Sequence, residues 1–148
     1  MILADVNLLL YAINSDAPQH QRARQWWEQV LSGTETVGLP WVVALAFIRI
    51  STHPKIFSQA LSVESALLYL DEWLEQPVLR LVSPGKAHWA ILRNLLQQTR
   101  LAGNLTTDAH IAALALEQGY TVFSADNDFK RYPGLKHVNS LEKGLIDR

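Results

Sequence analysis

The sequence predicts an α/β fold, with helices on both faces of a mostly parallel sheet and a single domain over residues 1–148. Short apolar runs typical of strands alternate with longer segments whose apolar residues recur every three or four positions, as in helices. The expected strands are apolar throughout, which indicates burial on both faces. The 148 residues, 49% hydrophobic and 18% charged, fit one ordinary domain with a substantial core.

The apolar run at residues 2–4 ends at Asp5 and predicts the first strand. Further strands are expected over residues 36–39, 78–82 and 121–124, with an edge strand over 135–138. Helices are expected over residues 7–14, 20–31, 41–50, 62–75, 86–99 and 108–118. Ser62 is a candidate N-cap, Ser83 before Pro84 marks another helix start, and Gly119 marks a stop. A loop is expected at residues 103–107 and a turn at 126–128.

The composition excludes several functional classes. The chain has no cysteine, which rules out disulfide scaffolds, thiolate zinc sites and cysteine nucleophiles. Thirteen basic and fourteen acidic side chains give a net charge of −1, so the overall charge does not argue for nucleic acid. No apolar run approaches the roughly 20 residues that a membrane-spanning helix needs. We therefore expect a soluble, cytoplasmic protein.

Three aspartates occupy positions where parallel sheets collect ligands. Asp5 follows the first expected strand, Asp126 follows the fourth, and Asp108 begins the helix between. Asp128 lies two residues past Asp126 and points the same way if the strand extends. A crevice with several carboxylates and no other ligand type favours Mg²⁺ or Mn²⁺, which would neutralise their repulsion. Such a site suits phosphodiester hydrolysis by a metal-activated water.

Each aspartate also has a purely structural interpretation. Asp108 could cap or stabilise a helix N-terminus, and Asp5 could cap the helix that follows it. The stretch 126–128 is an ordinary composition for an Asx-turn. Taken alone, the spacing leaves both interpretations open. The three tryptophans in amphipathic helices fit either the core or a partner surface: Trp26, Trp27 and Trp73.

Three extended motifs run through the chain: "ILADVNLLLYA", "WVVALAFIRISTHP" and "LTTDAHIAALALEQGYTVFSADNDFKRYPGL". Together they resemble the PIN-domain ribonucleases, and most closely the VapC toxins of bacterial toxin–antitoxin pairs. The resemblance covers essentially the whole chain. It implies a three-layer α/β/α sandwich and an endoribonuclease toxin that uses Mg²⁺ or Mn²⁺. It also implies an RNA substrate, a homodimer and a small VapB-like antitoxin whose C-terminal segment lies in the active-site groove.

The resemblance also implies roles for individual residues. The acids of the family pattern fall on Asp5, Asp108 and Asp126, with Asp128 as a neighbour. The polar residue two positions after the first acid is Asn7, and the hydroxyl residue near the last acid is Ser124.

One position departs from the family pattern. Most members carry a glutamate on the helix after the second strand, where this chain has Ala46. The departure removes one expected ligand or water-orienting carboxylate. Asp128 is the nearest candidate to replace it.

Basic residues near these acids are candidates for contact with the substrate. Arg49 lies three residues past Ala46, so we expect it on nearly the same face of an apolar helix. A buried guanidinium there would pair with a site carboxylate or contact a substrate phosphate. Lys130, Arg131 and Lys136 follow the acidic turn and could hold the RNA backbone, or form an ordinary solvated turn.

Two other functions compete with the metal-dependent ribonuclease. Without the helix glutamate, the domain could bind RNA or an antitoxin while cleaving little. A magnesium phosphatase on a similar sheet is the second alternative. The D-x-D motif of one large phosphatase class is Asp5-Val6-Asn7 here, which weighs against it.

Overall fold

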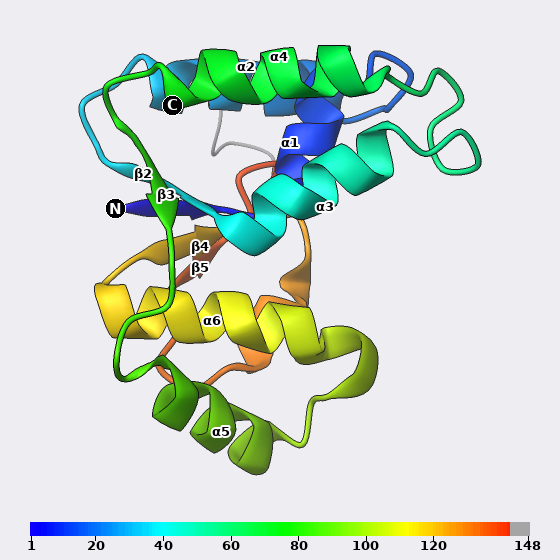
Figure 1. Cartoon of the computed structure of the whole chain (residues 1–148). Coiled ribbons are helices and arrows are strands. Elements are labelled where there is room, and N and C mark those ends of the chain that lie inside the picture. The colour runs from blue at the N-terminus through cyan, green and yellow to red at the C-terminus, as the bar shows by residue number, and fades with distance from the viewer. Residues whose placement is uncertain (143–148) are drawn as a thin grey trace.

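The computed structural model describes residues 1–142, so residues 143–148 of the expected single domain lie outside the described part of the chain. Five strands form one sheet in the order β3-β2-β1-β4-β5, and every neighbouring pair is parallel (Figure 1). The strands are β1 (Ile2–Ala4), β2 (Val37–Pro40), β3 (Leu79–Val82), β4 (Thr121–Phe123) and β5 (His137–Val138). The expected parallel α/β sheet is therefore confirmed.

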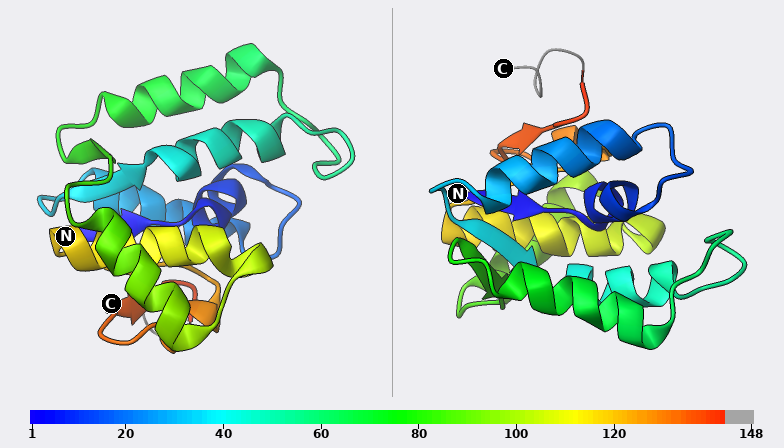
Figure 2. Two further views of the ribbon diagram at one scale, coloured as in Figure 1. Left: turned by 60° about the horizontal axis from the view of Figure 1, so that its bottom comes forward. Right: turned by 90° about the horizontal axis from the view of Figure 1, so that it is seen from above.

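Helices cover both faces of the sheet, as the uninterrupted apolarity of the strands predicts. The helices are α1 (Val6–Ile13), α2 (His20–Leu31), α3 (Trp41–Ser51), α4 (Val63–Leu74), α5 (His88–Thr99) and α6 (Thr106–Gln118). Helices α1 to α4 lie on one side, and α5 with α6 lie on the other (Figures 1 and 2). This arrangement is a three-layer α/β/α sandwich. Within residues 1–142, no helix combines the length and apolarity needed to cross a membrane.

The strand order places a switch point between β1 and β4. From β1 the chain builds outward through β2 to β3, then crosses the other face and adds β4 and β5 on the opposite side of β1. Loops leaving β1 and β4 therefore diverge to opposite faces. A crevice forms at the carboxyl ends of such strands, and ligands collect there. Asp5 follows β1 and Ser124 follows β4 at this position.

Three expected elements have a boundary that differs by more than one residue from the observed one. Helix α5 begins at His88, and its N-terminal region is held by the Glu117 carboxylate, which accepts hydrogen bonds from the Gly85 and Ala87 amides at 2.8 and 2.9 Å. Ser83 therefore does not cap it. The expected loop over 103–107 contains a short 3-10 helix, η1 (Gly103–Leu105), and α6 begins at once with Thr106. Strand β5 is shorter than expected because only two of its residues pair with β4.

The tryptophans at 26, 27 and 73 belong to the core. Trp27 and Trp73 meet edge to face with ring centroids 5.5 Å apart, and Phe47 of α3 packs on Trp73 at 5.0 Å. Trp26 stacks on Phe123 of β4 at 5.6 Å. Aromatic pairs of this geometry add to the free energy that burial alone contributes. These side chains thus pack α2, α3 and α4 together and α2 against the sheet. Of the two interpretations of the tryptophans, the structure confirms core packing.

Candidate active site

Asp5 lies at the carboxyl end of β1 and is the N-cap of α1. Its Oδ1 accepts a hydrogen bond from the Val6 amide at 2.8 Å, and its Oδ2 accepts one from the Ser124 hydroxyl at 2.7 Å. The side chain is only 6% exposed. Burial raises the pKa of Asp5, and the repulsion from Asp126 adds to that effect, while the hydrogen bonds to Ser124 and Val6 oppose it. The capping interpretation is therefore correct for Asp5.

Ser124 joins the segments that leave β1 and β4. Its hydroxyl donates to Asp5 and accepts hydrogen bonds from the Asn7 side-chain amide at 3.2 Å and from the Asp126 backbone amide at 2.9 Å. The side-chain oxygen Oδ1 of Asn7 in turn accepts a hydrogen bond from the Ala125 backbone amide at 3.3 Å. The structure therefore brings Asn7, Ser124 and Asp5 together in one network. This network holds the loop after β4 against the first turn of α1.

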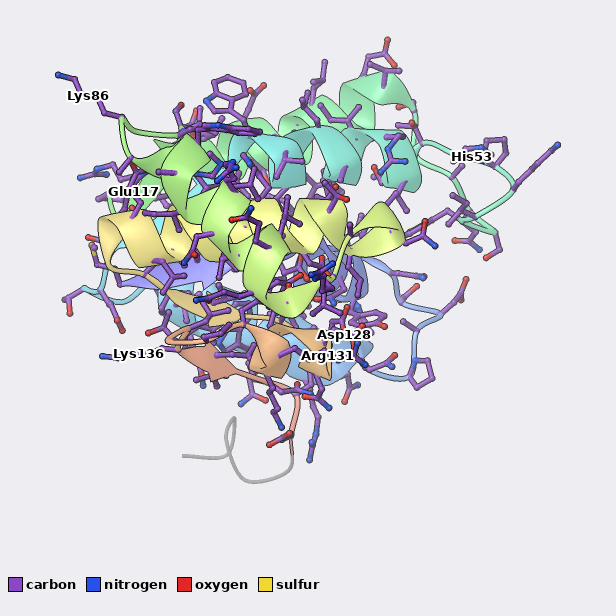
Figure 3. The ribbon with its side chains drawn as sticks, turned by 90° about the horizontal axis from the view of Figure 1, so that it is seen from below. His53, Lys86, Glu117, Asp128, Arg131 and Lys136 are labelled. Carbon is purple, nitrogen blue, oxygen red and sulfur yellow. The ribbon has the colours of Figure 1, made fainter. Side chains whose placement is uncertain are left out.

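The segment after β4 forms a 3-10 helix, η2 (Asn127–Arg131), and not an extended strand. Asp126 is its N-cap, and the Asp126 carboxylate accepts a hydrogen bond from the Asp128 amide at 2.9 Å. The expectation that a continued strand would align Asp126 with Asp128 is therefore wrong. The Asp128 carboxylate lies 3.2 Å from the Arg131 guanidinium, in an ion pair on the molecular surface (Figure 3).

Asp108 brings the third segment to the site. It is the third residue of α6, and α6 has no side-chain cap, so capping does not explain its position. The pKa of Asp108 is raised to about 7, first by burial and then by repulsion from Asp5, Asp126 and Asp128. Repulsion between carboxylates is strong only at short range, so Asp5, Asp126 and Asp128 lie near Asp108. The structure thus gathers the four predicted acids from β1, α6 and η2.

The donor set fits a hard divalent cation in kind. Carboxylate oxygens, a serine hydroxyl and an asparagine amide are ligands suited to Mg²⁺ or Mn²⁺, and the chain has no cysteine that would favour a softer metal. Within residues 1–142, no three His, Asp or Glu side chains are already grouped as ligands around a single point. Mg²⁺ commonly keeps several waters and takes only one or two carboxylates directly. The residues therefore fit an ion that reaches part of the cluster through water.

Arg49 does not occupy the expected buried position. It is exposed in the last turn of α3 and forms no ion pair with a described carboxylate. Trp41, Leu45 and Arg49 are spaced by four residues, so they share one stripe of α3, and all three are exposed. The helix is apolar almost all round, but this stripe faces outward. Ala46 is half-buried on the same helix.

The basic residues after the acidic turn are exposed, and they separate into two locations. Arg131 pairs with Asp128, and Lys130 is its exposed neighbour on η2. Lys136 precedes β5, so it lies at the amino end of the sheet, well away from Asp128 and Arg131 (Figure 3). The expectation that Lys136 lies near the acids is wrong. Strand β5 is parallel to β4, so between residues 131 and 136 the chain returns to the amino end of the sheet.

Two residues near the site were missed in the sequence. Tyr132 is buried, and its hydroxyl donates to the Leu105 carbonyl at 3.3 Å, immediately before α6. His137 of β5 has its Nε2 3.2 Å from the Ser124 carbonyl and lies close enough to lower the pKa of Asp5. Neither contact has a local signal, because Tyr132 stands in a Tyr-Pro-Gly turn and His137 on an edge strand.

A parallel α/β sandwich with an acidic cluster at its switch point defines the class of domain. The family model for the PIN domain matches residues 2–135, and the chain belongs to the PIN-domain family. Its curated relatives are VapC ribonucleases. Ribonuclease VapC33 of Mycobacterium tuberculosis is 37% identical over 143 residues, which cover 97% of this chain and 100% of the relative. Ribonuclease VapC37 of the same species is 38% identical and covers 92% and 94% of the two chains.

Solved structures show the same fold. A chain of the VapBC2 complex from Rickettsia felis, bound to a promoter DNA fragment, superposes with a TM-score of 0.69 at 21% identity. The match covers 93% of this chain and 98% of that one. VapBC-1 from nontypeable Haemophilus influenzae gives 0.66 at 16% identity, covering 95% and 98%. The expected PIN-like fold and family are therefore confirmed.

Proposed function

We propose that this protein is a metal-dependent endoribonuclease, the toxin of a VapBC-type pair. The observation that carries the proposal is the convergence of four carboxylates from three segments, where burial and then repulsion from the other three acids raise the pKa of Asp108 to about 7. The relatives with the highest identity reported above are ribonucleases, which fits hydrolysis of RNA. The proposed RNA substrate favours a cytoplasmic location.

In this proposal Asp5, Asp108 and Asp126 hold the divalent cation, and Asp128 lies beside them. When bound, Mg²⁺ or Mn²⁺ neutralises the cluster, stabilises negative charge on the scissile phosphate and lowers the pKa of a water molecule. Water attacks the phosphorus in line, the bond to the leaving oxygen breaks, and that oxygen takes up a proton. Ser124 and Asn7 keep the Asp5 carboxylate and the Asp126 backbone in place throughout. Lys130 and Arg131 face solvent beside the acids, where the RNA backbone would pass.

The test of this function is cleavage of RNA as a function of metal. We expect purified protein to cut RNA internally with Mg²⁺ or Mn²⁺, to lose this activity with a chelator, and to regain it when metal is restored. Small phosphate monoesters should not be hydrolysed. Cleavage that survives chelation would contradict the proposal. RNA binding without cleavage under every divalent cation would favour the binding module that Ala46 suggests, and monoester turnover would favour the phosphatase.

We also propose a homodimer formed by the exposed apolar stripe of α3. Trp41 is 51% exposed and Leu45 61% exposed, although a helix that is apolar all round is normally buried. Pro40, the last residue of β2, pairs with Val82 of the edge strand β3, so α3 begins beside that edge strand, in front of the sheet in Figure 1. Trp89, at the start of α5 after β3, is 69% exposed. Exposed apolar side chains as large as those of Trp41 and Leu45 on one helix stripe are typical of a protein interface.

Substitution Leu45→Glu tests the dimer. We expect the wild-type protein to have twice the 16.7 kDa chain mass in light scattering, and Leu45→Glu to be monomeric and folded, because a buried unpaired carboxylate disfavours the interface. Ile56→Glu is the matched control, since Ile56 is equally exposed but lies in the loop between α3 and α4. A monomeric wild type, or a dimeric Leu45→Glu variant, would contradict this interface.

A groove between α2 and α4 is the proposed docking site of the VapB-like antitoxin. It has a volume of about 630 Å³, with Trp27, Tyr69 and Trp73 among the residues that line it. Ile13 also lines the groove, and α1 leads from there back to Asp5. A peptide that follows α1 would therefore reach the acids within about 12 Å, the length of eight helical residues.

Reversal of one charge at the rim of this groove tests the docking site. We expect Glu72→Arg to cleave RNA normally but to need at least about 10-fold more of a cognate VapB-like protein for inhibition, because an altered charge pattern disfavours the encounter and the fit. Asp71→Arg is the matched control, because Asp71 neighbours Glu72 on α4 but does not line the groove. Equal inhibition of Glu72→Arg and the wild type would exclude this groove.

A further inference from the structure

We infer that Tyr132 is a positioning residue that sets the separation between Asp108 and the Asp126–Asp128 segment. The inference rests on the proposed function, because the purpose of that separation is to hold a divalent cation. Tyr132 ends η2, the short helix that carries Asp128. Its hydroxyl reaches across to the Leu105 carbonyl, which belongs to the N-cap residue of α6. One side chain therefore links the two segments that bring separate acids to the site.

The link opposes a repulsive force. Asp108 is repelled by Asp126 and Asp128, and the same three carboxylates act on the Tyr132 phenol, so the phenol lies within their field. The other acid-bearing segments are already tied together, since Ser124 bonds both Asp5 and the Asp126 amide. Asp108 has no such tie: its carboxylate accepts no hydrogen bond from any described residue, and the start of α6 has no side-chain cap. The Tyr132 hydroxyl thus provides a direct hydrogen bond from the end of η2 to the N-terminus of α6.

Burial keeps this hydroxyl a donor. Tyr132 is 3% exposed, and its ring packs beside Phe129 with centroids 6.1 Å apart. Burial and the neighbouring carboxylates raise the pKa of Tyr132 to about 12, so the phenol stays protonated where the enzyme works. Because packing fixes the ring, loss of the hydroxyl alone should release α6 without unfolding η2. Without the hydrogen bond, repulsion moves Asp108 away from Asp126 and Asp128. Part of the free energy of cation binding is then needed to bring these carboxylates together again.

The test compares Tyr132→Phe with Tyr120→Phe. Both substitutions remove one hydroxyl from a tyrosine ring and keep the ring itself, but Tyr120 precedes β4 at the opposite end of the strand from the acids. The first measurement is the affinity for Mn²⁺ alone, followed by electron paramagnetic resonance. We expect Tyr132→Phe to bind Mn²⁺ about 10-fold more weakly, as for loss of an outer partner of a metal site. Tyr120→Phe should match the wild type. The rate of RNA cleavage at saturating metal should recover to the wild-type value, because the metal itself restores the spacing.

A second measurement needs no metal. In metal-free protein, hydrogen exchange over residues 103–110 should be faster in Tyr132→Phe than in the wild type or Tyr120→Phe. Unchanged Mn²⁺ affinity, or unchanged exchange over this segment, would overturn the positioning role. A raised KM for RNA with unchanged Mn²⁺ affinity would also overturn it, because the phenol would then touch substrate. If the wild type itself binds no Mn²⁺, the proposed function fails, and the exchange measurement still decides whether Tyr132 holds α6.

Discussion

Replacing Asp108 with Asn is expected to reduce RNA cleavage by at least about 100-fold, the upper part of the range seen when a metal site loses a supporting group. The amide keeps the size of the side chain but removes the charge that Asp108 brings to the cluster. Because Asp108 does not cap α6, the helix loses only the weak dipole interaction of a first-turn acid. The measurement is kcat/KM on one RNA substrate at saturating Mg²⁺.

Asp71→Asn is the control for this experiment, since Asp71 is an exposed acid on α4 outside the cluster. It should cleave RNA at the wild-type rate. If Asp108→Asn retains more than a tenth of the activity while its fold is intact, Asp108 does not belong to the catalytic set. A loss accompanied by unfolding would be visible in the thermal transition.

The same substitution is expected to stabilise the metal-free protein at alkaline pH. The pKa of Asp108 is about 7 in the folded chain against 3.8 in the unfolded chain, so the folded state holds the extra proton between these values. Stability conferred by that proton is fully present below pH 3.8 and is lost as the pH rises through 7. A full shift of this size corresponds to roughly 4 kcal/mol. Because the carboxyl is only half-buried, solvent screening leaves about 1–2 kcal/mol.

Unfolding of the wild type and Asp108→Asn in the presence of a chelator measures this difference. The variant should gain stability relative to the wild type from pH 4 to pH 7 and hold a constant advantage above that. Added Mg²⁺ should stabilise the wild type more at pH 8 than at pH 5, since the ion competes with protons for the same oxygens. A wild type that is as stable as the variant at every pH would show that Asp108 does not suffer the repulsion described.

The placement of the acids was readable from sequence because it follows from a topological rule. Asp5 and Asp126 directly follow strands that the apolar runs reveal, and parallel strands bring their carboxyl ends to one edge. Asp108 begins a helix that the same rule brings to this edge, and the family resemblance favours a site role for it over a cap or dipole role. The network around Ser124 required coordinates, since its hydrogen bonds join residues that are more than 100 positions apart.

Other features could not be predicted because they depend on contacts or on exposure that the local sequence does not determine. Arg49 was expected to be buried because nearly every neighbour on its helix is apolar, yet the outward stripe of α3 is itself apolar. The composition of a helix shows that it is apolar all round. It does not determine whether each apolar face packs in the core or against a second copy of the chain. Tyr132 acts across 27 positions, and the Tyr-Pro-Gly sequence shows only the turn. The start of α5 depends on Glu117, which lies on another helix.

The most direct test of the central claim is a titration of the metal-free protein with Mn²⁺ near pH 7.5, in the wild type, Asp5→Asn, Asp126→Asn and the control Asp71→Asn. Convergence of β1, α6 and η2 on one cation predicts saturable binding in the wild type and in Asp71→Asn, and a loss of at least about 10-fold in affinity in each of the other two. Equal affinity in all four proteins would contradict the account, because the ion would then bind somewhere other than the acids at the β1/β4 switch point.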